Sequence, residues 1–312
     1  MPRHYNLLII TFANWLIKKI CIFAGYSKKM KKIFLIVSLI VLSLGAGFAQ
    51  KSEIGAFLGT SFYIGDLSHS TIFSECGFAG GVVYRYNFTP RWALKANIMF
   101  AKVRASDAVS NGSYERNLSF KSPITELSVQ AEVNFLKLYN QKGYNRFSPY
   151  VFAGVAVFSF NPQAEYNGKT YDLQPFGTEG QGLDPKKKYY SLCSFAIPFG
   201  IGLKVNIGRY VSIGAEWGMR FTCTDYLDDV SGTYYDNDAL RFNRGDIIAD
   251  LADRSPEIGQ PLNDHNSDRG NFKTTDFYSF CGGTITFKIG NEDRICDIKH
   301  KVSVRRKLGR KR

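Results

Sequence analysis

The sequence has few of the residues that most often carry catalysis or bind metals. It holds four histidines and six cysteines in 312 residues, and no two cysteines form a Cys-x-x-Cys pair. Zinc sites and redox motifs need such closely spaced ligands. No phosphate-binding glycine loop is present either. We therefore expect no cofactor, no metal, no small-molecule substrate and no enzymatic activity.

A charge surplus is also absent from the body of the chain, although the formal net charge is +13. Residues 1–49 contribute seven Lys or Arg and no acid, and residues 291–312 contribute nine against three acids. These two ends account for the whole surplus, so residues 50–290 are balanced. A basic charge confined to the ends gives little support for nucleic-acid binding.

Long apolar runs occur only near the N-terminus. A basic stretch at 30–32 precedes an apolar run over 33–44, and Gly47 and Ala49 place small residues before a cleavage point at Gln50. This order of basic, apolar and small residues is typical of a secretory signal peptide. The mature chain is therefore expected to be exported.

We interpret residues 30–49 as the signal peptide and residues 1–29 as an extension ahead of the true start at Met30. The alternative is an N-terminal membrane anchor, but the apolar run at 7–16 is shorter than the about 20 residues of a spanning helix. No spanning run follows residue 49.

The exported part is rich in strict alternation of apolar and polar residues. From Glu126 to Phe135 every second residue is apolar, and the residues between them are Glu, Ser, Gln, Glu and Asn. Side chains of a strand point alternately to its two faces, so this pattern predicts a half-buried strand. Seven further segments repeat it. The eight predicted strands are Glu53–Gly65, Phe78–Phe88, Trp92–Lys102, Glu126–Phe135, Ser148–Phe160, Ser194–Ile207, Val211–Thr224 and Phe277–Ile289.

The connections between these strands alternate between long and short. Long loops on one side and short turns on the other are typical of outer-membrane barrels with an even number of strands. Aromatic residues also cluster at strand ends, as interfacial girdles do. We predict an all-β fold, an eight-stranded antiparallel up-and-down transmembrane β-barrel with long extracellular loops. One helix is expected near 245–253 in the last loop, and a soluble exported sandwich is the alternative fold.

The polar face of each strand would fill the lumen of such a barrel. Buried charges must be paired. We therefore predict two ion pairs between neighbouring strands, Lys95 with Glu132 and Glu53 with Lys288. An eight-stranded barrel is just wide enough for its side chains to fill it, so it should not conduct. The alternative is a proton or ion path. The lumen charges are Arg85, Lys95, Lys204, Arg220, Lys288, Glu53, Glu126, Glu132 and Glu216.

The fifth strand is assigned with its aromatic residues outward. These residues are Tyr150, Phe152, Phe158 and Phe160. Three cysteines, Cys193, Cys223 and Cys281, also fall on outward positions. A bridge between Cys193 and Cys223 stays open, because a periplasmic location would permit it.

Loop carboxylates with a histidine could build a hydrolytic site. His265 is the candidate base, and His69 is the other histidine in the body of the chain. A carboxylate-rich loop is more often solvated surface, so a barrel hydrolase remains the less favoured alternative. The candidate acids are Asp225, Asp228, Asp229, Asp236 and Asp238.

Several short sequence motifs, in order along residues 53–290, resemble those of a known family. They include Tyr63–Leu67, Ser148–Gly154, Ile197–Gly200, Thr224–Ser231 and Arg269–Asn271. In these motifs the chain resembles the PorG-like outer-membrane barrels of Bacteroidota, a family of type IX secretion system components. The family-motif loop residues are Gly65, Asp66, Asp225, Tyr226, Asp228 and Asp229.

This resemblance implies a non-enzymatic barrel in the outer membrane that anchors a periplasmic secretion ring, built from a lipoprotein and its partner. The alternative within the family is a paralogue with an envelope-integrity or surface-ligand role. The basic tail at 291–312 departs from the family pattern. We expect it in the periplasm, where it would dock on an acidic partner or remain a disordered extension.

Overall fold

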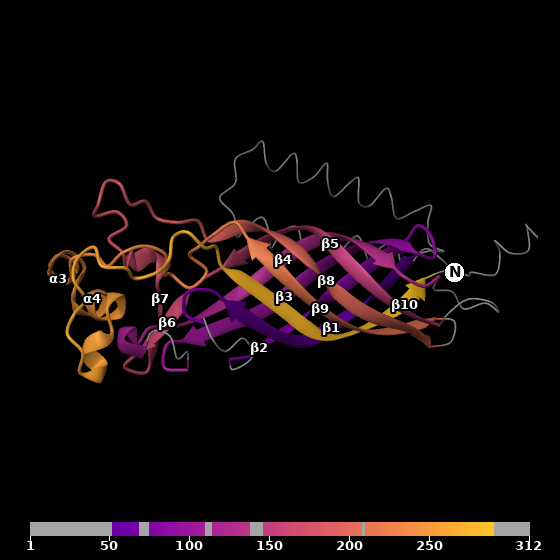
Figure 1. Ribbon diagram of the computed structural model, residues 1–312, viewed down its shortest axis with the longest axis horizontal. Helices are drawn as coiled ribbons and strands as arrows, with labels where there is room; N and C mark the ends of the chain where they lie inside the picture. The colour runs from indigo at the N-terminus through magenta and orange to yellow at the C-terminus, as the bar shows by residue number, and fades with distance from the viewer. Residues whose placement is uncertain (1–51, 69–74, 110–113, 138–145, 208–209, 290–312) are drawn as a thin grey trace, which may run out of the picture. The chain divides into compact units, whose positions relative to one another are not determined.

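A closed barrel is the main element of the described residues (Figure 1). The computed structural model describes residues 52–68, 75–109, 114–137, 146–207 and 210–289. Within them, eight long antiparallel strands pair in the circular order β3-β2-β1-β10-β9-β8-β5-β4, and β4 pairs with β3. The barrel strands are β1 (Ser52–Ile64), β2 (Gly77–Asn87), β3 (Trp92–Ser106), β4 (Ser119–Asn134), β5 (Phe147–Phe160), β8 (Cys193–Ile207), β9 (Val211–Thr222) and β10 (Phe277–Ile289).

The first and last strands close the barrel. β1 and β10 pair along their full lengths, from Ser52 opposite Ile289 to Ile64 opposite Phe277. This closure leaves no exposed edge among the eight strands. The predicted eight-stranded antiparallel fold is confirmed.

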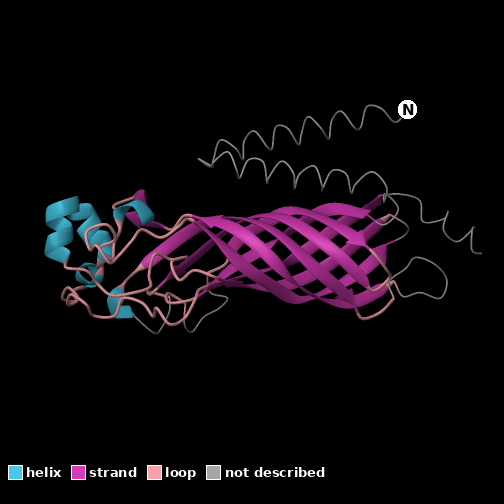
Figure 2. Ribbon diagram, turned by 90° about the horizontal axis from the view of Figure 1, so that it is seen from above, coloured by secondary structure: helices cyan, strands magenta, loops and turns pink. Residues whose placement is uncertain are grey.

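The connections after β1, β3, β5 and β9 gather at one end of the barrel and form a cap (Figure 2). The cap contains the hairpin of β6 (Gln163–Tyr166) and β7 (Lys169–Asp172), which turns through Asn167 and Gly168. Both turn residues have positive φ, as an Asn-Gly hairpin turn requires. Short 3-10 segments complete it: η2 (Tyr114–Arg116), η3 (Gln174–Phe176) and η4 (Ser255–Ile258).

The last loop holds two helices where one was predicted. The predicted helix is α4 (Asp246–Ala252), and α3 (Asn237–Arg244) precedes it. The Asp236 carboxylate caps α3 by accepting from the Ala239 amide at 3.1 Å. Hydrophobic patterning did not indicate α3, because this helix is mostly polar and buries only Leu240. Among the described residues, no helix is both long and apolar enough to cross a membrane.

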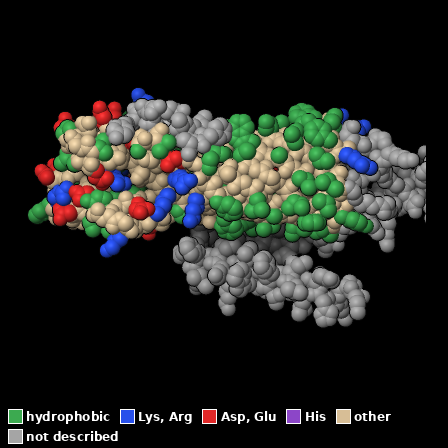
Figure 3. All heavy atoms as spheres, turned by 90° about the horizontal axis from the view of Figure 1, so that it is seen from below, with side chains coloured by type: hydrophobic (Ala, Val, Ile, Leu, Met, Phe, Trp, Pro, Cys, Tyr) green, Lys and Arg blue, Asp and Glu red, His purple; other side chains and the backbone are tan. Residues whose placement is uncertain are grey.

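The outer wall of the barrel is an apolar band (Figure 3). The predicted outward faces of β2, β3, β4, β8 and β9 are confirmed; Trp92 and Phe100 of β3, for example, are 55% and 56% exposed. The fifth strand was assigned with the wrong face outward. Tyr150, Phe152, Phe158 and Phe160 point into the barrel, and Val151 and Val155 point out.

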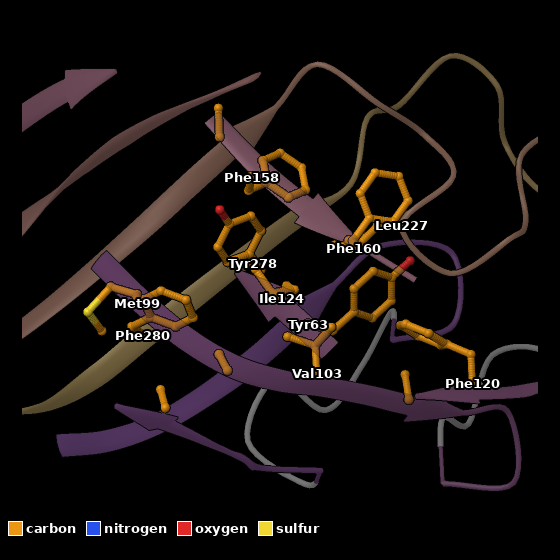
Figure 4. Packing of buried hydrophobic residues seen from close by; sticks show 14 of the residues in the cluster. Tyr63, Met99, Val103, Phe120, Ile124, Phe158, Phe160, Leu227, Tyr278 and Phe280 are labelled. Atoms are coloured by element: carbon orange, nitrogen blue, oxygen red, sulfur yellow. The ribbon is translucent and has the colours of Figure 1, made fainter. Parts of the chain in front are cut away.

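An apolar cluster fills the cap-side half of the interior. Phe158, Tyr278, Phe280, Met99 and Ile124 come from four strands and lie together there (Figure 4). The cluster continues into the cap through Leu67, Leu118, Leu227 and Val230. Barrel and cap therefore share one core. The predicted signal peptide at 30–49, residues 1–29 and the tail at 291–312 lie outside the described residues.

Candidate functional site

The half of the lumen beside the short turns is a layer of paired charges. Lys95 on β3 donates to Glu216 on β9 at 2.6 Å, and Tyr150 on β5 donates to the same carboxylate oxygen at 2.8 Å. In the strand order, β3 and β9 lie on opposite sides of the barrel. The Lys95 side chain, which is 0% exposed, therefore spans the interior.

Two glutamates share the guanidinium of Arg85. Arg85 donates from Nη1 to Glu53 and from Nε to Glu132, each at 2.9 Å. Lys204 on β8 donates to the second oxygen of Glu132. The carboxylate of Glu132 is therefore held between two cations that come from β2 and β8.

A second ion pair that spans the lumen lies where the charged layer meets the apolar cluster. Arg220 on β9 donates from Nε to Glu126 on β4 at 3.1 Å, and Tyr278 donates to the same oxygen at 2.9 Å. The Arg220 guanidinium also lies 4.1 Å from the centre of the Phe280 ring. Cation–π contact adds to the ion pair in such a desolvated place.

The structure corrects one predicted pair and confirms the position of the other. Lys95 pairs with Glu216 across the barrel and not with Glu132, because lumen side chains of so narrow a barrel reach past their neighbouring strands. Glu53 and Lys288 stand directly opposite each other on β1 and β10, as predicted. The Glu53 carboxylate accepts from Arg85, Asn87 and Thr286.

Glycines make room for the aromatic rings that fill this layer. A Cβ on Gly200 or Gly218 would come within 2.7 Å or 2.6 Å of the Phe152 ring, and one on Gly202 within 2.3 Å of Tyr150. The Lys95 ammonium lies 4.2 Å from the centre of the Phe152 ring. The lumen is therefore packed with side chains.

In the cap, one tyrosine joins two buried acids. The Tyr63 hydroxyl lies 2.6 Å from Asp228 and 2.6 Å from Asp276. A phenol has one proton, so the second contact is favourable only when that carboxyl is protonated and donates back. Burial raises the pKa of both acids, and the Asp276 charge raises that of Asp228 further. Both short contacts therefore form together when one of the two carboxyls holds a proton.

A second cluster joins the loops that follow β5 and β9. Asp229 accepts from Thr178 and Tyr190, each at 2.6 Å, and lies 3.8 Å from Arg269. Burial raises the pKa of Asp229 to about 6. Glu179 accepts from the amides of Ser231 and Gly232 and from Arg269. Asp229 thus ties side chains of three loop positions together, and Glu179 holds the backbone at Ser231 and Gly232 in place.

A third cluster attaches the loops after β1 and β3. Arg116 forms a two-point pair with Asp107 at 2.7 and 2.8 Å and donates to the backbone oxygens of Asp66 and Arg269. The Asp66 carboxylate accepts from the Asn271 amide at 2.7 Å. A Cβ on Gly65 would lie 2.1 Å from Tyr63 and from Asp276, which explains a glycine there.

The six family-motif loop residues therefore share one end of the barrel. Gly65, Asp66, Asp228 and Asp229 lie in the clusters above. Tyr226 stacks on Tyr190 with ring centres 4.6 Å apart, and burial raises the pKa of Asp225 to about 7. Four partners were not singled out from the sequence: Asp107, Arg116, Glu179 and Asp276. Glu179 stands in a Gly-rich stretch, and Asp276 stands next to a strand, so neither position marked it as a contact.

Four residues of the alternative hydrolytic site have other roles. Asp228 and Asp229 are buried in the cap, Asp236 caps α3, and His265 packs edge-on against Tyr235. Within the described ranges, no three His, Cys, Asp or Glu side chains are placed to hold a metal ion. His69 lies outside the described residues.

The cysteines at the strand ends are free thiols. The Cys223 amide donates to the Phe195 carbonyl at 2.9 Å, so Cys193 stands two residues out of register with Cys223. Such diagonal neighbours are about 7 to 8 Å apart, beyond the reach of a disulfide. Cys193, Cys223 and Cys281 are exposed on the outer wall, as predicted.

A family model matches most of the chain. It is described as a domain of unknown function (DUF6089), and it matches residues 31–250. The chain belongs to this family. No curated protein matches the chain.

Several solved structures are similar to this member of the DUF6089 family. The attachment invasion locus protein Ail of Yersinia pestis, solved with the heparin analogue sucrose octasulfate, is 9% identical, with 76% of this chain and 97% of that chain covered and a TM-score of 0.36. Neisserial surface protein A is 8% identical, with 76% and 97% covered and a TM-score of 0.37. The N-terminal barrel domain of Pseudomonas aeruginosa OprF is 12% identical, with 76% and 96% covered and a TM-score of 0.30.

Proposed function

We propose that this protein is a non-enzymatic barrel of the outer membrane that acts through its surfaces, as a scaffold or anchor. The observation that carries the proposal is the filled interior. Lys95 and Glu216 meet across the lumen at 2.6 Å, and an apolar cluster closes the cap-side half. A barrel filled in this way has no room for cargo, so its surfaces are what remain for function.

The dimensions of the outer wall support the membrane location. Trp92 and Phe100 point outward eight positions apart on β3, which is about 27 Å along the strand. At a strand tilt of about 40°, this distance crosses about 21 Å, close to the about 25 Å apolar band of outer-membrane barrels. The cap would then face outward and the short turns the periplasm.

The partner that we propose is the periplasmic ring of the type IX secretion system. The short sequence motifs that resemble the PorG-like family, and their order along the chain, support this role. Because the motif residues lie in the cap, the ring would meet other parts of the chain: the turn between β2 and β3, the turn between β4 and β5, or the tail at 291–312.

Two measurements test the scaffold role together. Deletion of the gene should abolish secretion of proteins that carry the type IX sorting signal, and the tagged barrel should co-purify with the ring lipoprotein. A chain lacking residues 291–312 tests whether the tail is the contact. Normal secretion in the deletion strain would contradict the scaffold role.

A surface-ligand role is the second candidate. Phe242 on α3 is 90% exposed, and Phe272 is exposed on the same loop. Aromatic residues exposed on a loop cap are common at binding sites. If Phe242→Ala and Phe272→Ala removed a cell-surface phenotype while secretion stayed normal, this candidate would replace the scaffold role.

A further inference from the structure

Three basic residues stand together on the outer wall where the apolar band meets the cap. Lys102 and Arg104 of β3 and Lys121 of β4 all point outward. Arg104 stands directly opposite Lys121 in the strand pairing, and Lys102 is the next outward residue on β3. Figure 3 shows Lys and Arg side chains where the apolar band gives way to the cap.

This arrangement is unfavourable by itself. Like charges directly opposite each other on neighbouring strands destabilise a sheet, and their Cβ atoms are only about 5 Å apart. Nearby acids compensate little: Lys121 lies 3.7 Å from Glu165, with both side chains exposed, and Glu75 lies near Arg104. Within the described residues, neither Lys102 nor Arg104 forms an ion pair. Arg104 donates to the Cys76 carbonyl at 2.8 Å.

The position of these three basic residues along the barrel axis indicates which ligand they bind. Phe100, the residue before Lys102 on the same face, is exposed, and so is Phe78 of β2. Lys102 and Arg104 follow Phe100 by about 7 and 14 Å along the strand. With the strand tilt, these distances place the two cations about 5 and 10 Å beyond Phe100 along the barrel axis. Headgroups occupy this layer beside the hydrocarbon.

We propose that Lys102, Arg104 and Lys121 bind the phosphate of an outer-leaflet lipid whose acyl chains lie against Phe78 and Phe100. This inference rests on the proposed outer-membrane location and orientation. Cations beside a membrane surface attract anionic headgroups, and Arg can hold a phosphate through two parallel hydrogen bonds. The bound lipid would offset the repulsion between Arg104 and Lys121.

Native mass spectrometry of the full chain in detergent tests the site, with diphosphorylated lipid A as the probe. The variant K102Q/R104Q/K121Q should weaken lipid A binding by about 100-fold, since each of the three cations contributes about fivefold. K186Q/K188Q/K273Q removes three charges from exposed cap positions and should bind as the wild type does. Equal binding by both triple variants would overturn the proposal.

Two further ligands identify the source of the phosphate. Lipid A without phosphates should not bind preferentially at the cluster, and inorganic phosphate alone should bind only weakly. If dephosphorylated lipid A bound equally well, or if free phosphate bound while lipid A did not, the lipid-phosphate assignment would be wrong.

Folding of each variant is checked by circular dichroism and by the gel migration of unheated protein. If the triple variant does not fold, K102R/K121R should bind as the wild type does, and R104Q alone should bind about fivefold less. Failure of the wild type to enter lipid vesicles would overturn the membrane location. Entry into vesicles with no difference between the triple variants would overturn only the lipid site.

Discussion

The Glu132 carboxylate compensates two buried cations at once, Arg85 and Lys204. Removing one partner from a buried ion cluster leaves the others without compensation, which typically costs about 3–5 kcal/mol. Glu132→Gln should lower the free energy of unfolding by about that amount, measured by urea unfolding in lipid vesicles. Glu165→Gln, at an exposed pair, should change it by less than about 0.5 kcal/mol. Similar small effects of both changes would show that the lumen pairs do not stabilise the barrel.

The acids of the cap make its stability depend on pH. Burial raises the pKa of Asp229 to about 6, above its value of about 4 in an unfolded chain. The folded cap therefore holds the proton more tightly than the open one, so its stability is complete below about pH 4 and declines up to about pH 6.

Between about pH 4 and about pH 6 we expect the folded cap to lose stability on the order of 2 kcal/mol. The loss should be seen as faster amide hydrogen exchange in the cap after correction for intrinsic rates. The Tyr63 cluster contributes in the same direction, because burial also raises the pKa of Asp228 and Asp276. Asp229→Asn should remove the part that titrates between pH 4 and 6. A cap that became more protected as the pH rose would contradict this account.

Strand β5 shows what alternation can and cannot establish. Its alternation gives the strand and its ends, because both faces are regular. It does not say which face is outward, since Val151, Ala153 and Val155 are as apolar as Tyr150 and Phe152. The glycines on β8 and β9 indicate which face of β5 points inward, because Gly200, Gly202 and Gly218 leave space for its aromatic rings.

This packing predicts the effect of filling one of those spaces. A Cβ on Gly218 would lie 2.6 Å from the Phe152 ring, so Gly218→Val should destabilise the barrel by about 1–3 kcal/mol. Adding Phe152→Leu should recover part of this loss, as measured by unfolding of the double variant. Gly283→Val, where a Cβ would have nothing closer than 3.7 Å, serves as the control. Equal losses at both positions would argue against the ring–glycine fit.

The strands could be predicted because each one carries its own alternation of apolar and polar residues. The ion pairs of the lumen and the clusters of the cap could not be predicted in this way. The lumen contacts join residues far apart in the chain, as with Lys95 and Glu216, and depend on which strands face each other across the barrel. The cap depends even more on long-range contacts. Arg116 gave no sequence sign that it would hold Asp107 and the backbone of Asp66 and Arg269.

The filled lumen predicts a barrel that does not conduct ions. Four lumen cations and four lumen anions are buried in mutual contact, and the apolar cluster lies in series with them. Purified protein in planar bilayers should show no steady conductance above that of lipid alone. Lasting, uniform current steps would contradict the sealed interior and would favour the ion-path alternative.

The central claim is that hydrocarbon covers the outer wall, and tryptophan quenching by brominated lipids tests it directly. Trp92 is exposed at the turn end of β3, and Trp217 is exposed near the middle of β9, where its indole donates to Ser279. In variants that retain one tryptophan, bromine deep in the acyl chains should quench Trp217 most strongly, and bromine near the headgroups should quench Trp92 most strongly. Quenching of both by aqueous acrylamide, with no effect of bromine at any depth, would contradict the claim.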